Sequence, residues 1–184
     1  MTALEDALPG YDFQVRHSRW IAAEPAAVWR ALSTLTLDDL WVTRPLVAIR
    51  HLGRTAGNGG RRLFTDGPVR MFVLDPPRYA LGGTVDRPWQ LRPDRIAVTS
   101  LQQFMDFDEP GWVAFLTDFT LEVRGNGVQL TTVTRGRCTD SRARRLFAPY
   151  WAFIRVPSGL IRRDILAAVS RAARRVDVSG DSRL

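Results

Sequence analysis

The sequence predicts an α+β domain in which an antiparallel sheet packs against one long C-terminal helix, and three observations support this. Apolar residues alternate along residues 11–22, the pattern of a strand with one buried face. Two longer β-type runs, residues 113–123 and 128–138, flank Asn126-Gly127, the strongest short signal for a hairpin turn. From Asp140 to about Val176 the apolar residues recur at helical spacing instead.

The first strand and the helices after it are expected between residues 11 and 41. Phe13, Val15 and Ile21 share one parity of the strand from Tyr11 to Ala22. Glu24-Pro25 then opens a short helix, because proline is well placed in a first helical turn. The ranges expected to be helical are Ala26–Leu32 and, as a second short helix, Leu37–Trp41.

A meander of short strands is expected next, since β-type runs alternate with Gly and Pro clusters. The runs are Leu46–Leu52, Arg61–Thr65, Val69–Leu74 and Tyr79–Val85. Asn58-Gly59 predicts a further hairpin turn. The stretch between Arg87 and Gly111 is interpreted as a weak strand plus a loop.

The last element is predicted to be a long amphipathic helix with Asp140 as its N-cap. Arg163, Arg171 and Arg174 lie outside its apolar stripe, and Pro157 should kink or interrupt it. The stripe consists of Phe147, Tyr150, Trp151, Ile154, Ser158, Ile161, Ile165, Val169 and Ala172.

Length and composition predict one domain over residues 1–176, followed by a flexible tail at 177–184. A chain of 184 residues with 45% hydrophobic and 24% charged residues is typical of one folded domain. Its longest apolar runs, such as Trp112–Leu116, are far shorter than the roughly 20 residues of a membrane helix. Cys138 is the only cysteine and no secretory signal is visible, so we expect a cytoplasmic protein.

The basic charge alone would suggest a polyanionic partner. The net charge is +7, and all 26 basic residues are arginine. These arginines are spread along the chain and form no basic arm, so we expect no specific nucleic-acid partner. A homodimer stays open.

Several short segments resemble those of a known superfamily. Ile21-Ala22-Ala23-Glu24-Pro25 followed by Val28-Trp29 is similar to the opening strand and helix of the START-like, or SRPBCC, superfamily, which includes polyketide cyclases and the birch-pollen allergen. Further segments resemble an uncharacterised bacterial branch: Gly111-Trp112-Val113, Thr134-Arg135, Thr139-Asp140, Arg144-Arg145-Leu146-Phe147, Tyr150-Trp151 and Ser158-Gly159-Leu160-Ile161-Arg162-Arg163.

The resemblance implies a helix-grip fold. In that fold a curved antiparallel sheet of about six to seven strands wraps around the C-terminal helix, with two short helices after the first strand. Members bind a small hydrophobic or amphipathic ligand, lipid- or polyketide-like, in a cavity between sheet and helix. We therefore expect such a ligand here.

The candidate ligand-binding residues are aromatic side chains with a few polar groups, the usual lining of an apolar site. Counting by twos from Ile21 puts Arg19 and His17 on the inward face, where an unpaired guanidinium is costly. A bulge, a solvent-filled rim or an internal carboxylate would relieve this cost, and so would a carboxylate, phosphate or carbonyl group of the ligand. The predicted set is His17, Arg19, Trp89, Phe104, Phe115, Phe119, Tyr150, Trp151, Ile154 and Ser158.

Metal and cofactor chemistry are not expected. His17 and His51 are the only histidines, which rules out a three-histidine zinc site, and Cys138 has no second thiol beside it. No acid/base pair can be placed, so a binding protein is favoured over an enzyme. The alternatives left open are a cyclase or dehydratase using His17, Tyr150 or an arginine, and a basic protein that engages a macromolecule.

Overall fold

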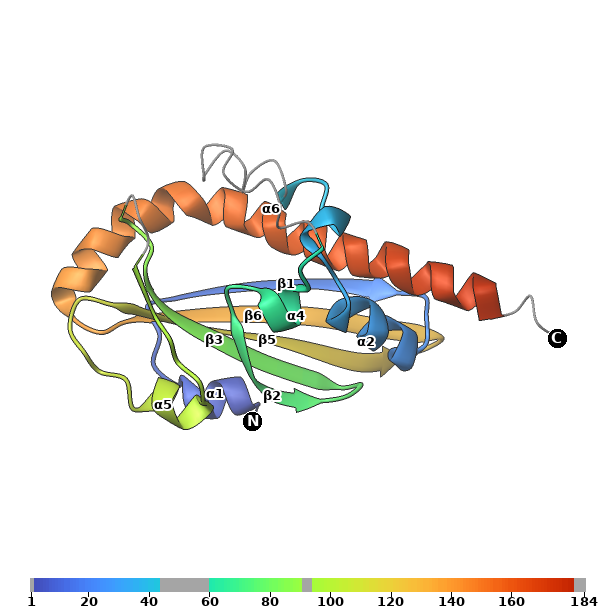
Figure 1. Ribbon diagram of the computed structural model, residues 1–184, viewed down its shortest axis with the longest axis horizontal. Helices are drawn as coiled ribbons and strands as arrows, with labels where there is room; N and C mark the ends of the chain where they lie inside the picture. Colours follow the sequence, from blue (N-terminus) through green and yellow to red (C-terminus); the bar gives the residue numbers. More distant parts are fainter. Residues whose placement is uncertain (1, 44–59, 91–93, 181–184) are drawn as a thin grey trace.

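The computed structural model describes residues 2–43, 60–90 and 94–180, in which helices cover both faces of one sheet (Figure 1). The helices are α1 (Ala3–Ala7), α2 (Pro25–Ser33), the 3-10 helix η1 (Leu37–Asp39), α4 (Leu63–Asp66), α5 (Leu101–Met105) and α6 (Ser141–Gly180). The strands are β1 (Phe13–Ile21), β2 (Arg70–Asp75), β3 (Tyr79–Arg87), β4 (Asp94–Ile96), β5 (Val113–Arg124) and β6 (Gly127–Cys138).

The six strands form one antiparallel sheet in the order β1-β6-β5-β3-β2, with β4 paired to β3. The long β5–β6 hairpin lies at its centre. α6 runs along one face of this sheet, and α2 and η1 follow the first strand, as predicted (Figure 1). The structure thus confirms the helix-grip arrangement.

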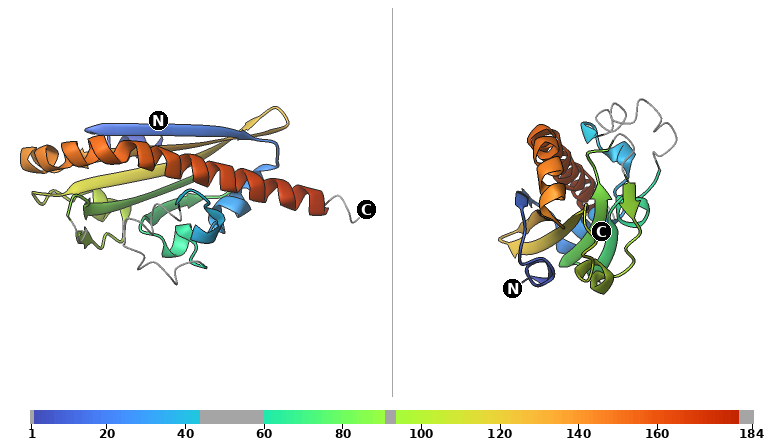
Figure 2. Two further views of the ribbon diagram at one scale, coloured as in Figure 1. Left: turned by 90° about the horizontal axis from the view of Figure 1, so that it is seen from above. Right: turned by 90° about the vertical axis from the view of Figure 1, so that its left-hand side faces the viewer.

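The two faces of the sheet carry separate cores. On the face toward α6, Ile21, Leu130 and Phe119 pack with α2 and with the C-terminal half of α6. On the opposite face, α1 and α5 cover residues such as Leu81 and Leu116. Figures 1 and 2 show α6 on one side of the sheet and α1 and α5 on the other. The face toward α6 is called the α6 side below.

The central hairpin has the predicted strands but a turn one residue earlier than expected. Arg124 pairs with Gly127, so the two turn residues are Gly125 and Asn126 and not Asn126-Gly127. Gly125 has a φ of 62°, which glycine adopts at little cost. The alternation nevertheless predicted the register of β5 correctly, because Phe115 and Phe119 both lie on the α6 side.

The expected strand Arg61–Thr65 is wrong. A short helix, α4, lies there, and a single bridge joins Arg62 to Thr36. The Asp66 carboxylate accepts a hydrogen bond from the Arg62 N–H at 3.1 Å, which closes the turn locally. The expected strand Leu46–Leu52 and the Asn58-Gly59 turn lie outside the described residues.

Other elements also differ from expectation. The stretch before Gly111 contains a short strand, β4, but also the helix α5, in which Ser100 caps the Gln103 N–H. α1 was not predicted; it begins with a capping box between Thr2 and Glu5.

The long helix α6 is continuous where an interruption was considered. It runs through Pro149 and Pro157 to Gly180, past the expected end at about Val176. Its first half curves in Figure 1, as proline inside a helix favours. Asp140 caps its start as predicted, because its carboxylate accepts from the Ala143 N–H at 2.7 Å.

Candidate ligand site between the sheet and α6

The site begins with an aromatic cluster at the N-terminal end of α6. Phe13 of β1 lies 4.4 Å from Trp151 and 5.1 Å from Phe147, measured between ring centroids. Phe115 of β5 lies 5.6 Å from Phe13, and Trp89 lies 6.4 Å from Phe147. Tyr150 also packs against Phe147. Four segments distant in sequence therefore contribute to one aromatic surface.

A polar cluster follows along the sheet, centred on Arg162 of α6. The Nε and Nη2 atoms of Arg162 donate to the Thr134 hydroxyl at 3.2 and 2.8 Å. Nη1 donates to the carbonyl and hydroxyl oxygens of Ser158, one helical turn earlier. Burial lowers the pKa of Arg162 to about 10, which leaves it cationic at neutral pH.

His17 and Thr132 extend the polar cluster onto β1 and β6, where they are directly paired. The Nε2 atom of His17 and the Oγ1 atom of Thr132 are buried and have no hydrogen-bond partner. Burial, with the positive charges of Arg162 and Arg163, lowers the pKa of His17 below 6.5. The imidazole is therefore neutral at pH 7.

The α6 side of the sheet stays accessible to solvent around these two clusters. Phe115 and Thr117 lie on β5, between β6 and β3, and yet both are only partly buried. On the opposite face of the same strand Ala114, Leu116 and Asp118 are fully buried. The α6 side of this central strand is therefore less completely covered than its opposite face.

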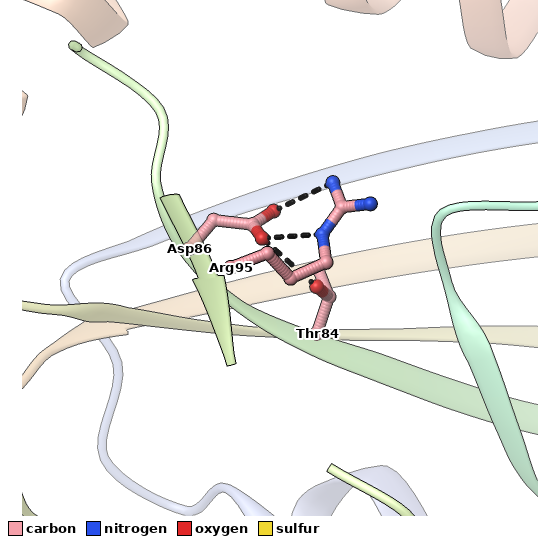
Figure 3. A network of polar contacts seen from close by, with 3 residues as sticks. All are labelled: Thr84, Asp86 and Arg95. Atoms are coloured by element: carbon pink, nitrogen blue, oxygen red, sulfur yellow. Dashed lines mark hydrogen bonds and ion pairs between the residues drawn. The ribbon is translucent and has the colours of Figure 1, made fainter. Parts of the chain in front are cut away.

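An ion pair between buried Asp86 and the exposed Arg95 lies on the α6 side of β3 and β4 (Figure 3). The Asp86 carboxylate accepts from Arg95 Nε at 2.6 Å, from Arg95 Nη2 at 3.3 Å and from the Thr84 hydroxyl at 3.1 Å. Asp86 is 8% exposed, so its charge is balanced locally by Arg95.

The structure brings most of the predicted site residues to this interior. His17, Phe115, Tyr150 and Ser158 belong to the clusters described above, as do Trp89 and Trp151. Ile154 is partly buried on α6 between them. Phe119 is buried farther along β5, 5.6 Å from Phe64.

Two predicted residues lie apart. Phe104 is fully buried on the opposite face of the sheet, where α5 packs its ring against Phe72, so it does not reach the α6 side. Arg19 is exposed on β1. In that strand only Ile21, at its end, is fully buried.

Sequence reasoning missed Arg162, Thr132, Thr134 and Thr117. A signal was present in each case, and for Thr117 it is the parity that this residue shares with Phe115 and Phe119. Arg162 follows Ser158 of the predicted stripe by one helical turn, and Thr132 and Thr134 share the parity of the buried Leu130.

Other features of the described residues do not add to this site. A pocket of about 460 Å³ opens beside α5. Another pocket, of about 220 Å³, lies between β2 and β4, which both pair with β3. Burial beside Asp12 raises the pKa of the Cys138 thiol to about 12, which makes it a poor nucleophile. In the described residues no cluster of three potential metal ligands occurs, and no helix there could cross a membrane.

Comparisons with known proteins give weak matches. No family model and no curated protein matches the chain. Among solved structures, protein MLL2253 from Mesorhizobium loti is 14% identical, with 86% of this chain and 98% of that chain aligned at a TM-score of 0.43. Ara h 8.0201 is 11% identical, with 89% and 98% aligned at a TM-score of 0.36. Protein CV1439 from Chromobacterium violaceum is 13% identical, with 85% and 96% aligned at 0.37.

Proposed function

We propose that this protein binds a small amphipathic molecule between the sheet and α6. The observation that carries the proposal is the partial exposure of Phe115 and Thr117 on the α6 side of a central strand. Aromatic rings flank this surface on one side and polar groups on the other, which is the composition of a site for a molecule with an apolar body and a polar end.

The first test uses Nile red, a neutral apolar dye whose fluorescence rises in apolar surroundings. Val15 is partly buried on β1 between Phe13 and His17, on the α6 side. Val15→Trp adds bulk on the α6 side, next to Thr134 of the polar cluster, and keeps a residue type that strands favour. We expect the wild type to bind the dye and the variant to bind it at least tenfold more weakly.

Phe153→Ala is the matched control. Phe153 lies on the outer surface of α6 and is 80% exposed, so its loss should leave interior binding unchanged. Dye binding that survives Val15→Trp but is lost in Phe153→Ala would place the dye on the outside of the helix and contradict the proposal.

A second candidate function, catalysis of a cyclisation or dehydration, is favoured by one observation. His17 has an unpartnered, buried Nε2 and a lowered pKa, so its neutral imidazole can take up a proton at pH 7. Mass spectrometry of the small molecules that copurify from cell extract distinguishes the candidates. A carrier releases its ligand with its mass unchanged, whereas a dehydratase releases a product that is lighter than the substrate by one molecule of water.

A further inference from the structure

The directions of the hydrogen bonds around Arg162 leave hydrogen-bond donors without an acceptor on the α6 side of the sheet. The Thr134 hydroxyl accepts from both Nε and Nη2 of Arg162, which occupies its two lone pairs. Its own proton is then donated to the Thr117 hydroxyl, 2.8 Å away. The hydroxyl hydrogen of Thr117 therefore does not point toward Thr134 and can be donated to another acceptor.

Two further polar groups lie on the strands next to this cluster. His17 and Thr132 are cross-strand neighbours, and Thr132 and Thr134 are consecutive residues on the α6 side of β6. Both Thr132 Oγ1 and His17 Nε2 are buried without a partner, an arrangement that costs free energy unless another molecule satisfies them.

The nearby carboxylates that the structure describes are engaged elsewhere. Asp86 is paired with Arg95, and Asp164, two residues after Arg162, accepts from the backbone N–H groups of Val42 and Thr43 at 2.8 Å. Within the described residues Arg162 therefore has hydroxyl and carbonyl partners but no carboxylate, and its charge is not balanced.

We propose that Arg162, with Thr117, Thr132 and His17, receives the carboxylate of a ligand whose apolar body extends toward the aromatic cluster. This inference rests on the proposed function and names the class of ligand: an apolar carboxylic acid. A carboxylate accepts several hydrogen bonds at once and supplies the negative charge that Arg162 lacks as a partner, whereas a neutral alcohol of equal length accepts fewer hydrogen bonds and carries no charge.

The test compares octanoate with octanol by titration calorimetry. The wild type should bind octanoate more tightly than octanol. Arg162→Met keeps an unbranched side chain without its charge; it should weaken octanoate binding roughly 10- to 100-fold, the equivalent of a charged hydrogen bond, and weaken octanol binding much less. Arg163→Gln is the matched control, because Arg163 is the neighbouring residue of α6 but is exposed. It should change both affinities by less than about threefold, as expected for an exposed charge.

A second variant keeps the test decisive if Arg162→Met does not fold. Thr117→Val removes one donor and leaves Arg162 bonded to Thr134, so octanoate binding should fall more than octanol binding does. Equal losses of both compounds, or octanoate binding unaffected by either substitution, would overturn the carboxylate inference alone. Failure of the wild type to bind octanoate, octanol and Nile red would overturn the proposed function as well.

Discussion

At the scale of single residues, Asp118 is the buried acid whose environment most favours the neutral form. It is 3% exposed on the face of the sheet that α1 covers. Burial raises its pKa, and donation by the Val133 N–H, the charge of Arg135 and the Tyr79 hydroxyl offset this only in part. The folded protein therefore holds the proton of Asp118 more tightly than the unfolded chain does.

We predict that stability falls as pH rises through this titration. The pKa of Asp118 is about 6 in the fold against 3.8 for the free side chain, so its stabilising contribution is complete below pH 3.8 and lost as pH rises through about 6. The loss amounts to about 3 kcal/mol. Asp118→Asn keeps an acceptor for Val133 and cannot titrate. Urea unfolding between pH 4 and pH 7 should show the difference in free energy of unfolding between variant and wild type growing with pH; parallel curves would contradict this.

At the scale of elements, two glycines lie where α6 and the strands pack together, one with room for a methyl group and one without. A methyl group on Gly159 of α6 would meet only the His17 ring, at 3.6 and 3.7 Å, an ordinary contact. Gly159→Ala should therefore stabilise the protein by about 0.5 to 1 kcal/mol, the difference in helix propensity.

Gly136 of β6 lies directly beneath the ring of Phe13, and a methyl group there would overlap that ring. Gly136→Ala must displace Phe13 from the aromatic cluster, at a cost of about 1 to 3 kcal/mol. Urea unfolding of both variants provides the measurement. If Gly136→Ala were as stable as the wild type, Phe13 would not pack over β6 as described.

The elements that could be predicted from sequence are those with long, regular patterns. β5, β6 and α6 each bury one face over many residues, so periodicity alone identifies them. α1, α4 and α5 have only four or five residues each. Helices that short are not stable alone, and they form here because they pack against the rest of the fold. Their apolar residues carry no period long enough to recognise.

At the scale of the whole molecule, the candidate site shows what residue patterns leave undetermined. Alternation along β1 correctly placed His17 on the α6 side. It could not show that Arg19 is exposed, because alternation indicates the face on which a side chain lies and not whether other residues pack over it. That packing depends on the path of α6 over the sheet. The same path carries Arg162 to Thr134, a contact between residues far apart in the sequence. Tertiary packing therefore decided which arginine lies in the interior.

The distribution of arginine also determines how the molecule should meet nucleic acid. The net charge is +7, but several arginines are engaged within the fold: Arg95 with Asp86, Arg144 with Asp12, Arg87 over Trp112, and Arg162 with Thr134. What remains gives a diffuse positive field, which attracts phosphates without reading bases.

We therefore predict weak and unselective association with DNA. Fluorescence anisotropy with two duplexes of unrelated sequence should give equal affinities at 50 mM salt, and both should be lost near 200 mM, because counterion release dominates such binding. Arg162→Met removes one charge from the interior and Arg163→Gln removes one from the surface, so only the second should weaken the association measurably. Base-selective binding that persists near 200 mM salt would require a surface organised for recognition, and the macromolecular partner left open by the sequence would then replace a small ligand as the main hypothesis.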